Sequence, residues 1–341
     1  DIKDLKKIKI EDALIKILSS PNHSNKNWVT SQYDQMVMCD TVQKSGSDAA
    51  IIRIHNKDKA IAVSVDSSAN YCKSYPLTGG KQIVCENWRN LISVGAKPLA
   101  ITNCLNFGNP ENQEIMGEFA ECLEGVKEAC NFLNYPVVSG NVSFYNGTNK
   151  KNIYPTPVIG GVGLIKKLSK PLSHNFKRAD STIILIGKTF GHIEQSCYLK
   201  ENYSITDGMP PEINLLNEKN NGENLLKLID KNLILSAHDI SNGGLITALS
   251  EMSLTSDFGA KIYKPKKLTN LFKYFFGEDQ ARYIIEIQTQ YLPIVEKILK
   301  ESNIYYENIG FTQENYFEIE GELKMSTKDL FKINNQWYNN Y

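Results

Sequence analysis

Residues 136–143, Pro-Val-Val-Ser-Gly-Asn-Val-Ser, are the stretch from which the fold can be worked out. The apolar and β-branched start is typical of a buried strand, and Ser-Gly-Asn is typical of a turn that ends it at the edge of a sheet. Open α/β proteins bind ligands at such edges. Gly140 lets the backbone approach a bound group, and Asn141 and Ser143 offer oxygens to a cation or a phosphate. The alternative is a strand closed by an ordinary turn.

The segments before and after this stretch alternate between strand and helix. The pattern predicts strands at 49–54 and 60–65 joined as a hairpin, a helix at 81–94, a strand at 98–102 followed by a polar loop at 103–110, a helix at 111–133, and a strand at 157–165. This order implies crossover connections and a sheet with helices on at least one face. The glycines at 160, 161 and 163 indicate that something packs closely on the last strand.

A second run of strands and helices follows a polar stretch. It comprises strands at 181–187, 233–237 and 282–287, helices at 245–254 and 292–301, and β-rich pieces at 305–311 and 316–319, with residues 200–222 expected to be a polar surface excursion. With 341 residues, two domains are expected. We predict a two-domain α/β protein with mixed sheets: a helical lead-in at 1–46 with a helix at 11–18, a first α/β domain at 47–166, a linker at 167–179, a second α/β domain at 180–330 and a tail at 331–341.

Composition excludes several classes of function. Thirty-eight basic and 38 acidic residues cancel, so no positive field favours nucleic acid. No apolar run approaches the length that crosses a membrane. The seven cysteines are odd in number and lack Cys-x-x-Cys spacing, which indicates reduced thiols in a cytoplasmic protein. The chain begins with Asp1 instead of Met, so we expect that it was cut from a longer polypeptide or lacks its beginning.

Few local motifs indicate chemistry. The Walker loop, the Gly-x-Gly-x-x-Gly fingerprint, the nucleophile elbow and the zinc-binding His-Glu-x-x-His helix are absent. Gly79-Gly80 before the helix at 81–94 offers backbone N–H groups to an anion, or serves only the turn. His238-Asp239 precedes a glycine-rich helix start, where the histidine either takes part in catalysis or shapes the turn. Glu278-Asp279 with Arg282 either binds a phosphate through magnesium or holds a turn together.

Taken together, the motifs identify a family. The chain resembles the second half of the large subunit of the phosphoribosylformylglycinamidine synthases, which are grouped with the aminoimidazole ribonucleotide synthases. In the first domain the shared motifs are Gln-Tyr-Asp at 32–34, Gly-Gly-Lys-Gln at 79–82, Trp-Arg-Asn-Leu at 88–91, Leu-Asn-Phe-Gly-Asn-Pro at 105–110, Val-Ser-Gly-Asn-Val-Ser at 138–143 and Thr-Pro-Val-Ile-Gly-Gly-Val-Gly at 156–163. In the second they are Gly-His at 191–192, Gln-Ser at 195–196, Ala-His-Asp-Ile-Ser at 237–241, Gly-Gly-Leu at 243–245 and Gly-Glu-Asp-Gln at 277–280 with Arg282.

The resemblance implies a fold and a reaction. The first-domain sheet is expected to form a barrel with the sheet of a partner domain, with the second α/β domain beside it. The reaction implied is an ATP-dependent ligation in purine biosynthesis, in which formylglycinamide ribonucleotide and ammonia from glutamine give the amidine. ATP and Mg²⁺ are the implied cofactors. The implied partners are the missing amino-terminal half, a glutaminase subunit and a small bridging subunit, and we expect a homodimer when the chain is isolated, because a bare sheet face is costly.

Site residues follow position by position from the resemblance. Gly140 matches an ATP-binding glycine, Asn141 a magnesium ligand and Ser143 a residue that contacts the ribonucleotide substrate. Asn103 stands where the family usually has an ATP-binding Asp, so weaker nucleotide binding is expected, because a charged hydrogen bond is stronger than a neutral one. Asn242 also replaces a usual Asp, which leaves a cation role for that loop open.

No catalytic residue is predicted in this chain. The family's catalytic histidines lie in a Ser-His-Asn-His-Pro-Ser motif that this sequence lacks. The chain alone is therefore expected not to make the amidine. The leading hypothesis is an enzyme half that contributes nucleotide and substrate contacts. The alternatives are a structural, docking half with a dead nucleotide pocket, and a stand-alone kinase-like relative.

Overall fold

The computed structural model describes residues 7–149, 151–168, 171–254, 256–265 and 270–340. The chain divides into two compact units, which we call the first unit (residues 35–171 and 207–226) and the second unit (residues 1–34, 172–206 and 227–341). Residues 1–6 of the predicted lead-in, 169–170 of the predicted linker and 341 of the predicted tail lie outside the described residues.

The first unit contains a six-stranded open sheet of order β1-β2-β3-β8-β4-β5, in which only β4 and β5 are parallel. The predicted hairpin is confirmed as β2 and β3. The elements of this unit are η2 (Val37–Cys39), β1 (Thr41–Gln43), β2 (Ala50–Arg53), β3 (Ala60–Asp66), α3 (Ala69–Ser74), α4 (Pro76–Ser93), β4 (Lys97–Asn106), α5 (Gln113–Leu133), β5 (Val137–Ser143), β6 (Gly147–Thr148), β7 (Lys151–Asn152), β8 (Thr156–Ile165) and the first turns of α7 (Leu215–Asp230).

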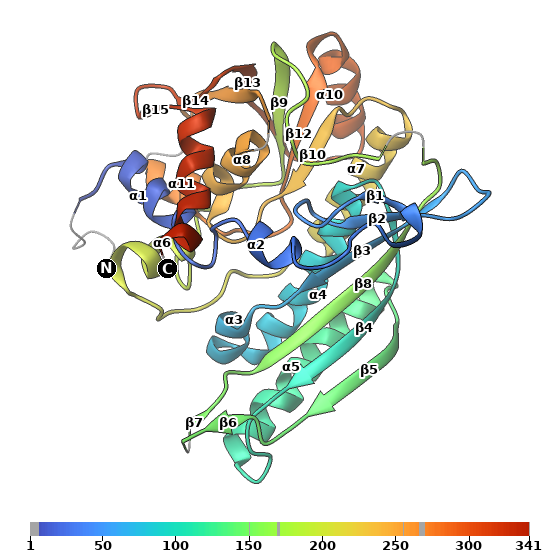
Figure 1. Cartoon of the computed structure of the whole chain (residues 1–341), viewed down its shortest axis with the longest axis vertical. Coiled ribbons are helices and arrows are strands. Elements are labelled where there is room, and N and C mark those ends of the chain that lie inside the picture. The colour runs from blue at the N-terminus through green and yellow to red at the C-terminus, as the bar shows by residue number, and fades with distance from the viewer. Residues whose placement is uncertain (1–6, 150, 169–170, 255, 266–269, 341) are drawn as a thin grey trace. The chain divides into compact units, whose positions relative to one another are not determined.

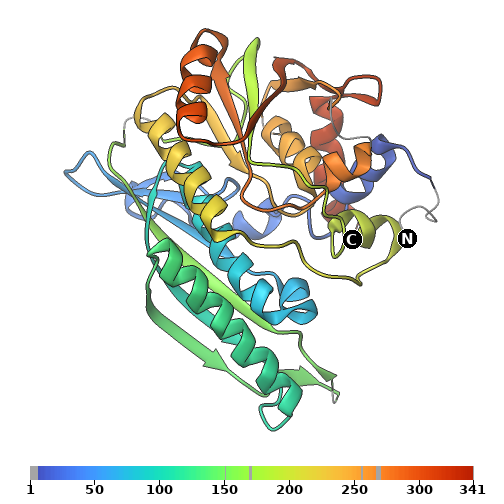
Figure 2. The same cartoon turned by 180° about the vertical axis from the view of Figure 1, so that it is seen from behind.

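Helices α4 and α5 cover one face of this sheet, and the other face is open within the described part of the unit. Figure 1 shows the strands in front of these two helices, and Figure 2 shows the helices in front of the strands. Burial alternates accordingly along β3, where Ala60 and Ala62 are buried and Ile61 and Val65 are exposed. The mixed α/β class is confirmed, whereas the predicted barrel requires a second sheet and stays a prediction.

Two glycines allow α4 and α5 to pack closely. A Cβ atom on Gly80 would lie 2.3 Å from the backbone oxygen of Cys122, and one on Gly125 would lie 2.1 Å from that of Leu77. The prediction that Gly79-Gly80 precedes the helix is wrong, because Pro76 starts α4 three residues earlier. The pair lies buried inside the helix, so its N–H groups form no anion site at a helix start.

The prediction of a loop beginning at Asn103 is also wrong. Strand β4 continues to Asn106, because β8 pairs with it on one side and β5 on the other through Asn103, Leu105 and Asn106. Asparagine is typical of turns when only the sequence is considered. Here two neighbouring strands satisfy the backbone, and Leu105 is buried.

The second unit contains a seven-stranded mixed sheet of order β10-β12-β9-β13-β11-β14-β15. Its elements are α1 (Ile10–Leu18), α2 (Asn27–Thr30), β9 (Ser181–Ile186), α6 (Cys197–Tyr203), the rest of α7, β10 (Ser236–Asp239), α8 (Gly244–Leu254), β11 (Phe258–Ile262), α9 (Leu271–Phe276), β12 (Tyr283–Gln288), η3 (Thr289–Tyr291), α10 (Leu292–Glu301), β13 (Tyr306–Glu314), β14 (Tyr316–Ile319), β15 (Leu323–Ser326) and α11 (Thr327–Asn339).

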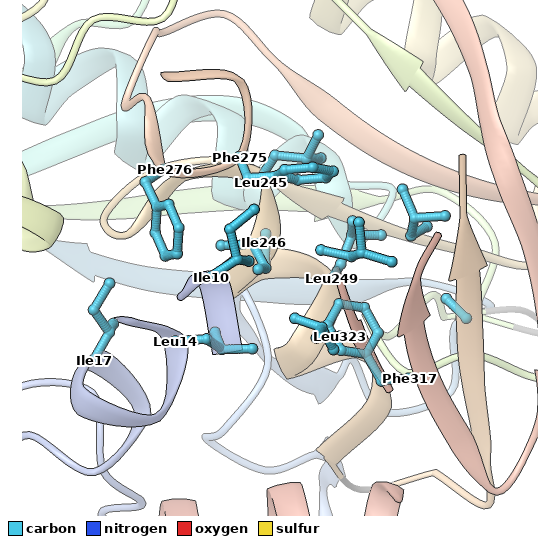
Figure 3. Packing of buried hydrophobic residues seen from close by; sticks show 14 of the residues in the cluster. Ile10, Leu14, Ile17, Leu245, Ile246, Leu249, Phe275, Phe276, Phe317 and Leu323 are labelled. Carbon is cyan, nitrogen blue, oxygen red and sulfur yellow. The ribbon is translucent and has the colours of Figure 1, made fainter. Parts of the chain in front are cut away.

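The core of this unit joins α1 to α8, α9 and the strands β14 and β15. Helix α1 forms because its apolar residues recur at helical spacing and acidic residues occupy its first turn. Its buried face, with Ile10, Leu14 and Ile17, packs against a cluster that includes Leu249 and Phe317 (Figure 3). The predicted helices at 11–18, 245–254 and 292–301 are confirmed.

The surface excursion predicted for residues 200–222 is confirmed for residues 204–214, which form a mostly exposed loop, and is wrong for the residues on either side of them. Helix α6 ends at Tyr203, and α7 begins at Leu215. Within α7, Glu218 is completely buried and accepts a hydrogen bond from Arg89 Nη1 at 2.7 Å. Among the described residues, no helix has the length and apolar character needed to cross a membrane.

Candidate functional site

All four predicted site residues lie on the neighbouring strands β4 and β5. The parallel register pairs Asn103 with Gly140, Cys104 with Asn141, and Asn106 with Ser143. The prediction that β5 is buried and ends at a turn near Ser139 is wrong. It continues to Ser143 as the exposed edge of the sheet, and Val138 is 72% exposed. The physical reason is that, in the part of the chain that the structure describes, β5 has a hydrogen-bonded neighbour strand on one side only.

Asn103 and Gly140 form a close pair on the helix-covered side of the sheet. A Cβ atom on Gly140 would lie 2.2 Å from Asn103 Oδ1, so glycine is required for Asn103 to keep its position. Because β5 is an edge strand, part of the backbone of Gly140 also faces outward, where a ligand can reach its polar groups.

Asn141 and Ser143 lie on the open side of the same edge, since neighbouring residues of a strand point to opposite faces. The Nδ2 atom of Asn141 lies 3.9 Å from Cys104 Sγ. Ser143 Oγ lies 3.3 Å from Asn146 Oδ1, and Asn146 Nδ2 donates to the Ser143 backbone oxygen at 2.9 Å. The structure thus gathers the four residues at one edge and divides them between its two faces.

The open face has an apolar part and a polar part. Its apolar part, on β2, β3 and β8, includes the exposed residues Ile52, Ile61, Val65 and Val162. Its polar part, on β4 and β5, comprises the paired rows Thr102 with Ser139, Cys104 with Asn141, and Asn106 with Ser143. An apolar surface suits contact with another protein, whereas hydroxyl, thiol and amide groups suit a polar ligand.

A polar network that the sequence did not reveal supports this sheet from the helix side. Asp66 accepts hydrogen bonds from the side-chain nitrogens of Asn87 and Asn90, both at 2.8 Å, and from Ser64 Oγ at 3.1 Å. Burial raises the pKa of Asp66 above 3.8, and these hydrogen bonds offset part of the rise. The expectation of close packing on the glycine-rich strand is confirmed, because a Cβ atom on Gly161 would lie 1.9 Å from Asn87 Oδ1. The sequence feature that could have indicated this network is the spacing of Asn87 and Asn90, three residues apart on one face of α4.

In the second unit, the acidic motif holds loops together. Asp279 accepts hydrogen bonds from the backbone N–H groups of residues 190–192 at 2.8–3.1 Å. Glu278 accepts from the N–H groups of Cys197 and Gly243, both at 2.7 Å. Arg282 donates to three oxygens of nearby residues. These bonds favour the structural alternative over a phosphate site. Asn242 lies exposed in the loop beside Gly243.

His238 lies inside strand β10 instead of the turn predicted after Ala237, because β10 pairs with β12 through Asp239. Its Nε2 atom lies 3.1 Å from Glu251 Oε2 on α8. Burial alone would raise the pKa of Glu251, but the hydrogen bond from His238, with His23 and His174 nearby, holds it below 4.5. This pairing favours a structural role for His238.

Comparison with known proteins agrees with this architecture. Residues 46–165 match the family described as AIR synthase related protein, N-terminal domain, and residues 178–319 match the corresponding C-terminal domain. The phosphoribosylformylglycinamidine synthase subunit PurL of Pelagibacter ubique is 54% identical over 341 residues, which is 100% of this chain and 47% of that protein. The chain spans about half the length of the curated relatives it matches.

Solved structures show the same fold. The structure described as T. maritima PurL complexed with FGAR has a TM-score of 0.76 and 15% identity, covering 96% of this chain and 54% of that one. The structure of T. maritima PurL complexed with AMPPCP has a TM-score of 0.59 and 26% identity over 85% of this chain and 42% of that one.

Proposed function

Because the chain belongs to the family of AIR synthase related proteins, we propose that it is the carboxyl-terminal half of a phosphoribosylformylglycinamidine synthase subunit, a cytoplasmic enzyme of purine biosynthesis. Both domains of the family occur in it. The PurL subunit of Pelagibacter ubique, which is about twice as long, matches it over all of its 341 residues. The observation that carries the proposal is the position of Asn103, Gly140, Asn141 and Ser143 together at one sheet edge.

The donor set at this edge fits a magnesium–nucleotide complex. Magnesium prefers oxygen ligands and keeps several waters, with its other contacts made by nucleotide phosphates. Asn141 supplies an amide oxygen on the open face, and Gly140 offers the polar backbone groups that face outward from the edge strand. Asn103, on the helix-covered side of the same edge, provides a neutral hydrogen-bonding group, and Ser143, on the open face, provides a hydroxyl group for the ribonucleotide.

The proposed contribution of this half is to bind and orient. In the whole enzyme the substrate amide oxygen is phosphorylated, and ammonia then displaces phosphate to give the amidine. Bound magnesium neutralises charge on the transferring phosphoryl group. This chain's residues hold the nucleotide and substrate at the edge of β5. The groups that move protons come from the other half, because the family's catalytic histidine motif is absent here.

We assign the apolar part of the open face to a partner sheet. Ile61 and Val65 are exposed there, and Val65 is 65% exposed. In the complete enzyme the partner is the sheet of the amino-terminal half, which closes the barrel. In the isolated chain it is a second copy, giving a homodimer. The glutaminase and small bridging subunits are further proposed partners.

A structural half with a dead nucleotide pocket is the second candidate. It is favoured by Asn103, which stands in place of a usual Asp, and by the absence of any Asp or Glu from the sequences of β4 and β5. Calorimetric titration of Mg²⁺ and a non-hydrolysable ATP analogue, with and without the amino-terminal half, separates the two candidates.

The expected result is binding that requires Asn141 and appears or strengthens when the other half is present. If the assembled halves bind nucleotide equally well with Asn141→Ala, the dead-pocket alternative is correct. Amidine formation by this chain without an added polypeptide would contradict the assignment of proton transfer to the other half.

A further inference from the structure

Asn106 is a diagonal neighbour of Asn141 on the open face, and its amide orientation is fixed by the backbone. Its Nδ2 atom donates to the backbone oxygens of Cys104 and Thr156, each at 3.2 Å. Both partners are carbonyl oxygens that only accept, so the NH₂ group must face them. The Oδ1 atom of Asn106 is therefore left as an acceptor, and among the described residues its hydrogen-bond contact is with the weakly donating Cys104 thiol at 3.9 Å.

Asn141 is oriented in a related way. Its Nδ2 atom faces the sulfur of Cys104, which is paired with Asn141 in the register and lies two residues before Asn106 on β4. The two amides thus flank one thiol on one face, one row apart. Asn106 on β4 and Asn141 on β5 are diagonal neighbours across the two strands. Such neighbours are separated by about 7–8 Å, which is too far for both amide oxygens to bind one ion directly without rearrangement, yet suits a hydrated ion.

The charge of this surface is the second observation. Neither β4 nor β5 contains a carboxylate, and Asp66, the acidic residue of the sheet's strands, lies on the helix-covered side. A set of neutral oxygens offers little to compensate the dehydration of a bare Mg²⁺ ion, which holds its waters strongly. The negative charge that holds the ion at this surface must therefore come from the phosphate groups of a nucleotide that binds together with it.

We propose that Asn106 accepts a hydrogen bond from a water on the magnesium ion assigned to Asn141, and that the site holds this ion only as its complex with nucleotide phosphates. The inference rests on the proposed function and adds a residue and a binding order to it. Asn106 is a positioning residue, because it acts on the ion through water. Outer contacts of this kind typically change metal affinity 10–100-fold.

Calorimetry on the chain assembled with its amino-terminal half tests the proposal. Asn106→Ala is expected to weaken binding of the Mg²⁺–AMPPCP complex about tenfold and to leave AMPPCP binding in EDTA unchanged. Asn131→Ala, on an exposed position of α5, is the control and is expected to change neither. Equal weakening with and without metal, or no weakening, would overturn the proposal.

A second variant keeps the test valid if Asn106→Ala folds poorly. Asn141→Asp leaves the backbone hydrogen bonds of Asn106 intact and adds the missing charge beside the ion. It is therefore expected to bind Mn²⁺ alone, measured by electron paramagnetic resonance, where the unchanged chain does not. No gain of Mn²⁺ binding, or Mn²⁺ binding by the unchanged chain, would overturn the proposal. Loss of Mg²⁺–AMPPCP binding in Asn141→Ala but not in Asn106→Ala would refute this inference alone, whereas no binding by the unchanged assembly would refute the proposed function as well.

Discussion

Replacing Glu218 by Gln tests whether one buried ion pair fixes the start of α7 in the first unit. The side chains of Glu218 and Arg89 are both 0% exposed, and their charged atoms lie 2.7 Å apart. The substitution keeps the size of the side chain and removes its charge. Arg89 stays protonated in proteins, so the variant removes the carboxylate that lies 2.7 Å from a buried cation.

The expected loss of stability is large. Two unit charges about 4 Å apart at an effective dielectric constant of 20 attract by about 4 kcal/mol. Removing one partner of a buried pair typically costs about 3–5 kcal/mol. For unfolding units of 150–250 residues, each kcal/mol moves Tm by about 2–4 °C, so the drop should be roughly 6–20 °C.

Tryptophan fluorescence provides a local assay. Trp88 precedes Arg89 and packs against α7, since a Cβ atom on Gly222 would lie 2.3 Å from Trp88 Cζ3. The chain has three tryptophans. In a background with Trp28→Phe and Trp337→Phe, urea unfolding followed by fluorescence therefore reports on this contact.

Two comparisons make the result decisive. Glu124→Gln removes the charge of a solvent-exposed pair with Lys127, at 2.9 Å, and should not shift the transition measurably. The double variant Arg89→Met/Glu218→Leu replaces the pair by apolar groups and should be close to neutral or stabilising. The reasoning is refuted if Glu218→Gln loses no more stability than Glu124→Gln.

Three further predictions concern the first unit. Val65→Asp should lower the dimer fraction of the isolated chain in light scattering, because it places a charge on the open sheet face; an unchanged dimer would rule out that face as the interface. Gly161→Ala should cost about 3 kcal/mol or more in urea unfolding, because its methyl group displaces Asn87. Gly117→Ala should gain about 0.5–1 kcal/mol, because among the described residues no atom beyond its chain neighbours and the backbone of its own helix lies within 4 Å of the added methyl group. Equal effects of the two would count against the packing argument. The carboxyl of Asp66, whose pKa burial raises, contributes stability below its unfolded value of about 3.8 that is lost as the pH rises through the folded value. Asp66→Asn should therefore gain stability relative to the unchanged chain toward neutral pH; a difference independent of pH would disprove this.

The periodicity of apolar residues was sufficient to predict an element where a single apolar face determines its structure. Helix α10 begins and ends where the sequence predicts, at Leu292 and Glu301, because its apolar stripe is regular and Pro293 suits its first turn. Helix α7 was missed altogether, because its first turns are polar. Glu218 is buried there by a partner 129 positions away, and local patterns do not carry such information.

The candidate site was predicted through whole motifs and not through secondary structure. Family resemblance selected Asn141 and Ser143, and the structure places both on one face of β5. The local prediction of a turn near Gly140 was wrong, because pairing with β4 extends the strand. The requirement for glycine there comes from contact with Asn103, and only the three-dimensional structure reveals that contact.

The bare edge of β5 has a practical consequence for handling the chain. Its seven residues carry no charge and no proline, the usual features that stop one edge strand from adding to another. Aggregation during expression is therefore expected to begin at this strand, and a ligand or subunit that covers it would act as a solubility factor in addition to any part it plays in the reaction.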